Sequence, residues 1–239
     1  MTTVVISQPL LFPWPGFFEL LASADIYIHL DDVQFADKSF TNRIQFKLPT
    51  GPSWMTIPIR DRSARKLICD IEATDEPWRR RHRELIRHSL AKAPHLDEAL
   101  ALFDAAYTRQ KPVDLLIDSV ELPAKYLGVF NARQVLKSSS LGIKSVGSQR
   151  ILDIVRHVGG SRYLTAHGAA NYLDHESFSH AGIAVEYADY SLTPYPQLHG
   201  SFTPYVSVLD LVANMGQASG TVIRPRTIPW ADFLTRRNG

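Results

Sequence analysis

The chain has 239 residues, of which 45% are hydrophobic and 21% charged, and its 26 basic and 24 acidic side chains give a formal charge of +2. This composition is that of a globular protein, and we expect a single domain over residues 1–239. The nearly balanced charge argues against a general nucleic-acid-binding or membrane-surface protein. No apolar run approaches the roughly 20 residues of a spanning helix, and the N-terminus lacks a signal-peptide pattern. We therefore expect a cytoplasmic protein that does not engage a membrane.

The first part of the chain is predicted to be rich in β-structure. The apolar pattern indicates a strand at 4–7, a short helix at 15–23 with Pro15 at its first position, a strand at 26–30 and a further strand at 67–71. Between them, residues 44–48 and 55–59 each alternate apolar and polar side chains, and Thr50-Gly51 lies between the two runs. This pattern is typical of a β-hairpin.

The apolar period changes in the middle of the chain. Three successive amphipathic faces predict a helical block at about 76–129. After it, the pattern indicates a strand at 133–137, a helix with Ser148 as its N-cap, a strand at 162–165, a helix at 174–181 and a strand at 183–187. Alternating strands and helices favour parallel pairing. The predicted fold class is α/β, in which a mixed sheet combines an N-terminal β-rich part, a central helical block and a C-terminal βαβ part.

Polar side chains are concentrated in the first forty-three residues. Gln8 follows the first predicted strand, Asp31 and Asp32 follow the second, and Gln34, Lys38, Asn42 and Arg43 come soon after. Each of these groups costs free energy if it is buried without a partner, so their density argues for a functional site. Sites in α/β sheets lie at the carboxyl ends of strands, where these groups and the loop Ala166-His167-Gly168 are expected to converge.

These residues also resemble a known family. Gln8-Pro9, the turn Pro13-Trp14-x-Gly16-Phe17, the segment Asp31-Asp32-x-Gln34 and the pair Asn42-Arg43 are similar to the opening of the WbqC-like protein family. The resemblance continues through Tyr163, Gly168, Tyr172-Leu173, Tyr195, Gln197, Phe202, Pro204, Ser207 and Asp210. It implies a biosynthetic enzyme of a surface-polysaccharide pathway, and for some members it implies aminoacyl or glycyl transfer to an amino sugar.

Two residues are the catalytic candidates. A carboxylate at Asp31 would hold a substrate ammonium group or act as general base, and His167 lies in a glycine-flanked loop where an imidazole titrates near neutral pH. The family is expected to have a small residue in place of this histidine. The predicted substrate-binding residues are Gln8, Trp14, Gln34, Lys38, Asn42, Arg43, Tyr195 and Gln197. Lys38 and Arg43 would bind an anionic group, or instead form structural ion pairs with nearby carboxylates.

Several kinds of chemistry lack a sequence signal. No histidine, cysteine or carboxylate group has metal-ligand spacing, and neither a dinucleotide-binding nor a phosphate-cradling glycine motif occurs, so no metal and no cofactor is predicted. The single cysteine, Cys69, lies in an apolar segment typical of the protein core. The run 79–83, rich in arginine, is typical of a solvated helix face.

Two functions remain open. In the first, a transferase or condensing enzyme joins a primary amine to an activated acyl or carbonyl group, giving an amide or imine on an amino sugar or small metabolite of polysaccharide or secondary-metabolite biosynthesis. The partners are then a small-molecule substrate and an acyl or aminoacyl carrier, with transfer RNA as the one nucleic acid compatible with the reaction. In the second, the protein is a non-catalytic accessory that binds a nucleotide sugar or another anionic ligand in the same pathway.

Overall fold

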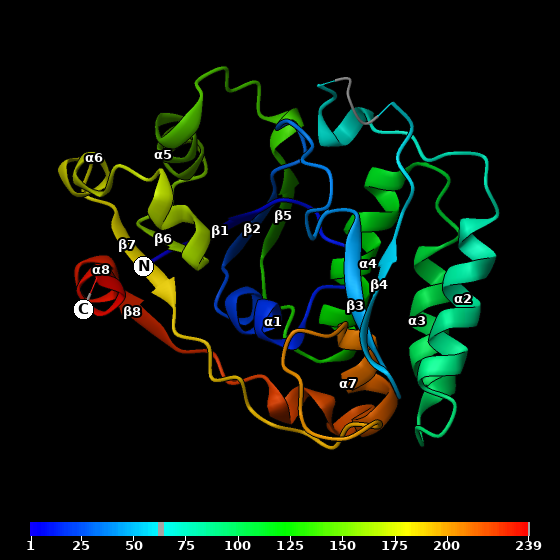
Figure 1. The fold of residues 1–239 in the computed structure, drawn as a ribbon. Coiled ribbons are helices and arrows are strands. Elements are labelled where there is room, and N and C mark those ends of the chain that lie inside the picture. The colour runs from blue at the N-terminus through cyan, green and yellow to red at the C-terminus, as the bar shows by residue number, and fades with distance from the viewer. Residues whose placement is uncertain (62–64, 239) are drawn as a thin grey trace.

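The computed structural model describes residues 1–61 and 65–238. In these residues, six strands form one sheet in the order β5-β2-β1-β6-β7-β8 (Figure 1). The strands are β1 (Thr3–Ser7), β2 (Ile26–His29), β5 (Gln134–Lys137), β6 (Arg162–Thr165), β7 (Ala184–Ala188) and β8 (Thr227–Pro229). The first five pair in parallel, and β8 pairs antiparallel with β7 at the edge. The predicted α/β class with a mixed sheet is confirmed.

Helices cover both faces of the sheet because β1 alternates its side chains between two apolar cores. Val5 belongs to the larger core, which includes α1 (Pro15–Ala22), while Val4 and Ile6 belong to the smaller core. The smaller core is built with α5 (Gly147–His157) and α6 (His175–His180). A strand that is apolar on both sides is typical of a parallel sheet covered by helices on both faces.

The hairpin and the helical block lie between β2 and β5 in the sequence. The predicted hairpin is confirmed as β3 (Arg43–Leu48) and β4 (Gly51–Thr56), which pair antiparallel outside the main sheet. The predicted helical block consists of α2 (Trp78–Ser89), α3 (Leu96–Ala106) and α4 (Pro112–Tyr126). Figure 1 shows α2 and α3 at the end of the molecule opposite to α8 (Trp230–Asn238). The segment between β7 and β8 carries α7 (Val208–Met215), which lies against α3.

The predicted strand at 67–71 is wrong. Ile68–Asp70 form one turn of 3₁₀ helix, and the backbone amides of Ile68 and Cys69 donate to the carbonyls of Val33 and Asp31. These bonds tie the apolar segment to the loop after β2, so it is buried without running alongside a long strand. Ser148 is not the N-cap of α5, since the helix begins at Gly147 and the Ser148 hydroxyl accepts a bond from the backbone amide of Asp174.

Two elements at the end of the chain were missed by the sequence interpretation. They are the edge strand β8 and the helix α8 that follows it directly. β8 has only three residues and includes Pro229, so its apolar pattern is too short to recognise. None of the helices described is both long enough and apolar enough to cross a lipid bilayer.

Candidate ligand-binding site

The two adjacent carboxylates after β2 are sealed in a polar cluster. Asp31 is only 2% exposed, and its carboxylate accepts bonds from the hydroxyl of Ser138 at 3.2 Å and from the amide and hydroxyl of Ser139 at 2.9 and 2.7 Å. Asp32 accepts a bond from the same Ser138 hydroxyl and pairs with Arg150. The cluster joins the carboxyl end of β2 to the segment after β5. Its donors saturate Asp31, which lines none of the cavities described below.

The residues after β1 are held in two separate contacts. Gln8 is half-buried, and its amide oxygen accepts a bond from the Thr41 hydroxyl at 3.3 Å. The Trp14 ring packs edge-on against Tyr190 and Tyr205, with centroids 4.8 and 5.1 Å away. A methyl group at Gly16 would lie 1.9 Å from this ring, so only glycine leaves room for it. The tryptophan therefore fixes the start of α1 against the C-terminal loop.

Three further predicted binding residues lie at or near the surface. Gln34 and Lys38 are exposed, and Lys38 has a left-handed backbone with φ of 59°. The Arg43 guanidinium lies over the ring of Trp54, 4.0 Å from its centroid, which is a cation–π contact on the outer face of the hairpin. The structure does not bring these side chains into the cluster around Asp31.

Tyr195 and Gln197 belong to a different buried cluster. The Tyr195 hydroxyl donates to Asp210 Oδ1 at 3.0 Å, and Lys47 Nζ donates to Gln197 Oε1 at 3.2 Å. Burial raises the pKa of Asp210 to about 6, against the opposing effects of the Tyr195 hydrogen bond and the Lys47 charge. Lys47, Tyr195 and Asp210 are each at most 6% exposed. This cluster fastens the C-terminal loop to the hairpin.

His167 lines a cavity of about 580 Å³ at the carboxyl ends of β6 and β7. Its ring Nε2 lies 2.7 Å from the carbonyl oxygen of Ala188, which can only accept, so Nε2 carries the proton. The ring also lies close to Tyr190 and Phe233. Since Asp31 and His167 lie in different places, their catalytic roles stay predictions.

Asn42 lines a smaller cavity, of about 350 Å³, between the end of the hairpin and α2. Its backbone carbonyl accepts from the amide of Ile57 at 2.8 Å, and its side-chain Nδ2 donates to the carbonyl of Ile57 at 3.2 Å. Because that carbonyl can only accept, the remaining atom of the amide must be the oxygen. Asn42 Oδ1 is buried and has no hydrogen-bond partner. Asn42 thus carries an unsatisfied acceptor, held in one orientation, on the cavity wall.

A second unsatisfied group lies on the same cavity. Thr74 is held beside the hairpin because its amide donates to the carbonyl of Pro58 at 2.9 Å, next to an antiparallel bridge between Ile59 and Ala73. Its hydroxyl oxygen is buried and, like Asn42 Oδ1, has no partner. A buried polar atom without a hydrogen bond costs about 1–3 kcal/mol, so two of them beside one cavity need an explanation.

Aromatic and charged side chains complete the wall of this cavity. Trp78 and His82 come from α2, and the charged residues are Asp37, Glu76 and Arg81. His82 Nε2 donates to the carbonyl of Thr56 at 3.0 Å, so its Nδ1 accepts from the hydroxyl of Tyr107 at 2.7 Å. Burial lowers the pKa of His82 to about 4, which keeps the ring neutral. It is a rigid neutral strut of the wall.

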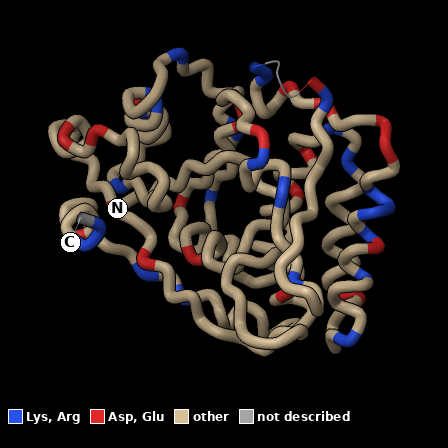
Figure 2. Tube along the Cα trace, viewed as in Figure 1, with Lys and Arg blue, Asp and Glu red and all other residues tan. Residues whose placement is uncertain are grey.

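Trp78, His82 and Thr74 were missed by the sequence interpretation. His82 was included in the solvated run 79–83, whose arginines indeed form surface contacts: Arg80 pairs with Glu84, and Arg83 with Asp104. The available signal was the spacing, because residues four apart on a helix share a face and Trp78 marks the apolar face. Figure 2 shows blue and red side chains interspersed along α2, which fits a solvated outer face.

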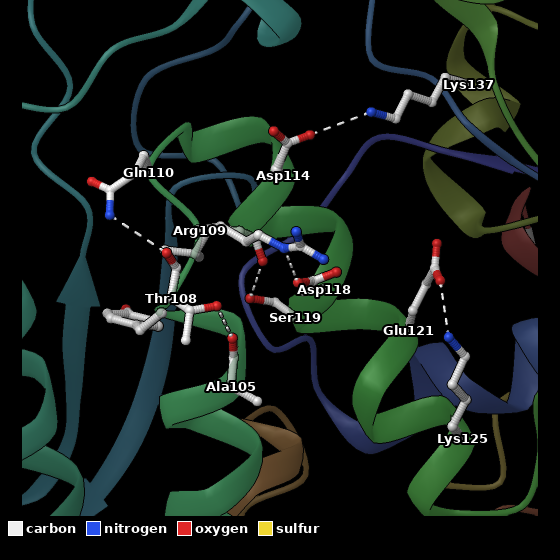
Figure 3. A network of polar contacts seen from close by, with 12 residues as sticks. Ala105, Thr108, Arg109, Gln110, Asp114, Asp118, Ser119, Glu121, Lys125 and Lys137 are labelled. Atoms are coloured by element: carbon white, nitrogen blue, oxygen red, sulfur yellow. Dashed lines mark hydrogen bonds and ion pairs between the residues drawn. The ribbon is translucent and has the colours of Figure 1, made fainter.

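A larger cavity, of about 830 Å³, adjoins the first and shares Thr74 and Trp78 with it. Its wall includes Gln110 and Lys111 from the turn between α3 and α4. Figure 3 shows how this turn is fixed: Arg109 Nε donates to Asp118 at 2.6 Å. Cys69 also lines this cavity, and burial and the charges of Asp70 and Asp31 raise the pKa of its thiol, so it is not an activated nucleophile. Within residues 1–61 and 65–238, no group of three potential ligands is arranged to hold a metal ion.

Comparison with known proteins gives two matches. The model of the WbqC-like protein family matches residues 8–222. A Mycobacterium tuberculosis (strain ATCC 25618 / H37Rv) protein, printed as "Uncharacterized protein Rv1507c", is 28% identical over 233 residues, covering 94% of this chain and 98% of that protein. No solved structure matches the chain. Asn42, Thr74 and His82 all lie inside the matched range, whereas β8 and α8 lie beyond its end.

Proposed function

Because the chain belongs to the WbqC-like protein family, we propose that it is a biosynthetic enzyme that joins a primary amine to an activated acyl or carbonyl group. The product is an amide or an imine, and the amine belongs to an amino sugar or a similar small metabolite. The observation that carries this proposal is the pair of unsatisfied buried acceptors, Asn42 Oδ1 and Thr74 Oγ1, beside the 350 Å³ cavity.

The groups on the cavity wall favour a ligand rich in hydrogen-bond donors. An amide oxygen accepts hydrogen bonds, a threonine hydroxyl accepts and donates, and the carboxylates of Asp37 and Glu76 attract an ammonium group. Trp78 adds an aromatic ring, against which the apolar face of a sugar ring can pack. A volume of about 350 Å³ lies at the lower end of the range for small-molecule sites, which suits one sugar ring.

The second substrate is assigned to the adjoining 830 Å³ cavity. The shared residues Thr74 and Trp78 lie where the two compartments meet, so an acyl group held in the larger one can reach an amine held in the smaller. Holding the two reactants together supplies much of the rate enhancement. The nitrogen forms a bond to the acyl carbon, the leaving group departs with its electron pair, and a wall carboxylate takes the proton that the amine releases.

The test uses glucosamine as the probe and glucose as its matched neutral sugar, titrated into the full-length protein by calorimetry. We expect glucosamine to bind and glucose to bind at least tenfold more weakly. Thr74→Val removes only the hydroxyl and is expected to weaken glucosamine binding about tenfold. Thr165→Val is the control, since Thr165 is a buried threonine in β6 whose hydroxyl accepts a bond from Tyr163. Equal binding of both sugars, or equal loss in both variants, would contradict the assignment.

Catalysis is tested separately from binding. Glucosamine is incubated with aminoacyl-transfer-RNA, an acyl-coenzyme A or an acylated carrier protein, and the products are measured by mass spectrometry. An amide whose mass is that of the amine plus the acyl group, and which disappears in Thr74→Val, supports the enzyme. Glucosamine binding without any product from these donors supports the alternative, a non-catalytic accessory protein.

Asp31 and His167 enter the same assay as predicted catalytic residues. Neither lines the amine cavity, so Asp31→Asn and His167→Ala are expected to retain glucosamine binding. If either variant keeps that binding and loses turnover, the prediction of its catalytic role is supported.

A further inference from the structure

A separate cavity, of about 580 Å³, lies at the carboxyl ends of β6 and β7. The chain runs outward from β1 to β2 and β5 on one side, and then from β6 to β7 on the other, so the direction of winding changes between β1 and β6. Ligands of open α/β sheets bind outside the carboxyl ends of the strands near such a change. Figure 1 shows this region, beside α8, at the opposite end of the molecule from α2 and the amine cavity.

One wall of the cavity is aromatic and held in place. The Phe233 ring of α8 stacks on Tyr187 of β7 at 4.1 Å with an interplanar angle of 11°. The His167 ring lies 4.8 Å from Phe233, and its hydrogen bond to the carbonyl of Ala188 fixes its orientation. Because Nε2 donates in that bond, Nδ1 is an acceptor in the neutral ring. The wall therefore offers two planar rings and one hydrogen-bond acceptor.

The opposite wall carries more positive than negative charge. Arg236 and Arg237 come from the last turn of α8, and the nearest carboxylate of the lining is Asp189, 3.9 Å from Arg236. Arg237 donates to the side-chain oxygen of Asn171 at 2.7 Å, which holds its guanidinium against the segment after β6. Guanidinium groups bind phosphate oxygens through paired donors. Two arginines against one aspartate give the site a net attraction for an anion.

We propose that this cavity binds a nucleoside phosphate, with the phosphate on Arg236 and Arg237 and the base against Phe233 and His167. The chain has no glycine-rich phosphate loop, so side chains hold the phosphate instead of backbone amides. The family match ends at residue 222, and β8 and α8 supply Ile228, Phe233 and both arginines. The site is thus built partly by a segment outside the matched range, and it does not depend on the amine cavity.

The test titrates adenosine 5′-monophosphate into the full-length protein by calorimetry. We expect binding that falls at least tenfold in Arg236→Gln/Arg237→Gln and severalfold in Phe233→Leu, which keeps an apolar side chain but removes the ring. Both arginines are exposed, so their replacement leaves the fold intact. The charge-matched control is Arg224→Gln, which removes an exposed arginine outside the lining and is expected to bind as the unaltered protein does.

Two further ligands separate the parts of the proposal. Inorganic phosphate alone and adenosine alone are each expected to bind at least tenfold more weakly than the nucleotide. Equal binding of inorganic phosphate would overturn the nucleoside part, and equal binding of adenosine would overturn the phosphate part. Absence of nucleotide binding, or an equal loss in Arg224→Gln, would overturn the site. Thr74→Val is expected to leave nucleotide binding unchanged, so this result is independent of the amine proposal.

Discussion

The opening segment of the chain supplies two buried polar regions that differ in one respect. Around Asp31, every carboxylate oxygen has a donor: the hydroxyls of Ser138 and Ser139 and a backbone amide. Around Asn42, the amide and the neighbouring Thr74 each keep an oxygen without a partner, beside a cavity. Sequence alone weighted the two regions alike. The difference teaches that a satisfied polar cluster is architecture, while unsatisfied acceptors beside a cavity indicate where a ligand binds.

The largest effect on stability is expected from Asp31→Ala. The substitution removes a buried carboxylate and leaves the donors of Ser138 and Ser139 without an acceptor, which costs about 4 kcal/mol. For a chain of this length we expect the melting temperature to fall by about 10 °C. Thermal and urea unfolding measure the loss. A change below about 1 kcal/mol would show that the cluster does not hold β2 to β5, and would remove this side of the comparison.

A pH-dependent effect of about 3 kcal/mol is expected from His82. Burial lowers its pKa from 6.5 to about 4, so the folded state favours the neutral ring. That stabilisation is complete above pH 6.5 and is lost as the pH falls from 6.5 to 4. The measurement compares urea unfolding of the unaltered protein and His82→Gln across this range. Their difference should shrink toward acid pH, and a constant difference would show that His82 is not a neutral strut.

The part of the fold that follows from local pattern was predictable. The parallel strands and the hairpin each carry an apolar period, and Pro15 does begin α1. Ser207 does accept a bond from the amide of Leu209 at the start of α7, as a first-turn cap does. The 3₁₀ turn at Ile68–Asp70 was not predictable, because its amides bond to the loop after β2 and not to a neighbouring strand.

The candidate site was less accessible to sequence than the fold. Asn42 was among the predicted binding residues, but its partners on the cavity wall come from the segment around Thr74 and from α2. Those segments meet only through long-range contacts, such as the bond from the Thr74 amide to the carbonyl of Pro58. A hydroxyl without a partner has no sequence signature, because the lack of a partner is a property of the packed structure.

The smallest expected effect is also the sharpest test of the comparison, because it depends on sign. Thr74→Val replaces a buried hydroxyl that has no partner by a methyl group of the same shape, so it is expected to leave stability unchanged or raise it by about 1 kcal/mol. Thr165→Val makes the same chemical change where the hydroxyl accepts a bond from Tyr163 at 3.0 Å. It orphans the tyrosine hydroxyl and is expected to cost about 2 kcal/mol. Urea unfolding of both variants without ligand measures the pair. Equal destabilisation would mean that Thr74 has a partner in the protein, and its hydroxyl would then no longer indicate a ligand.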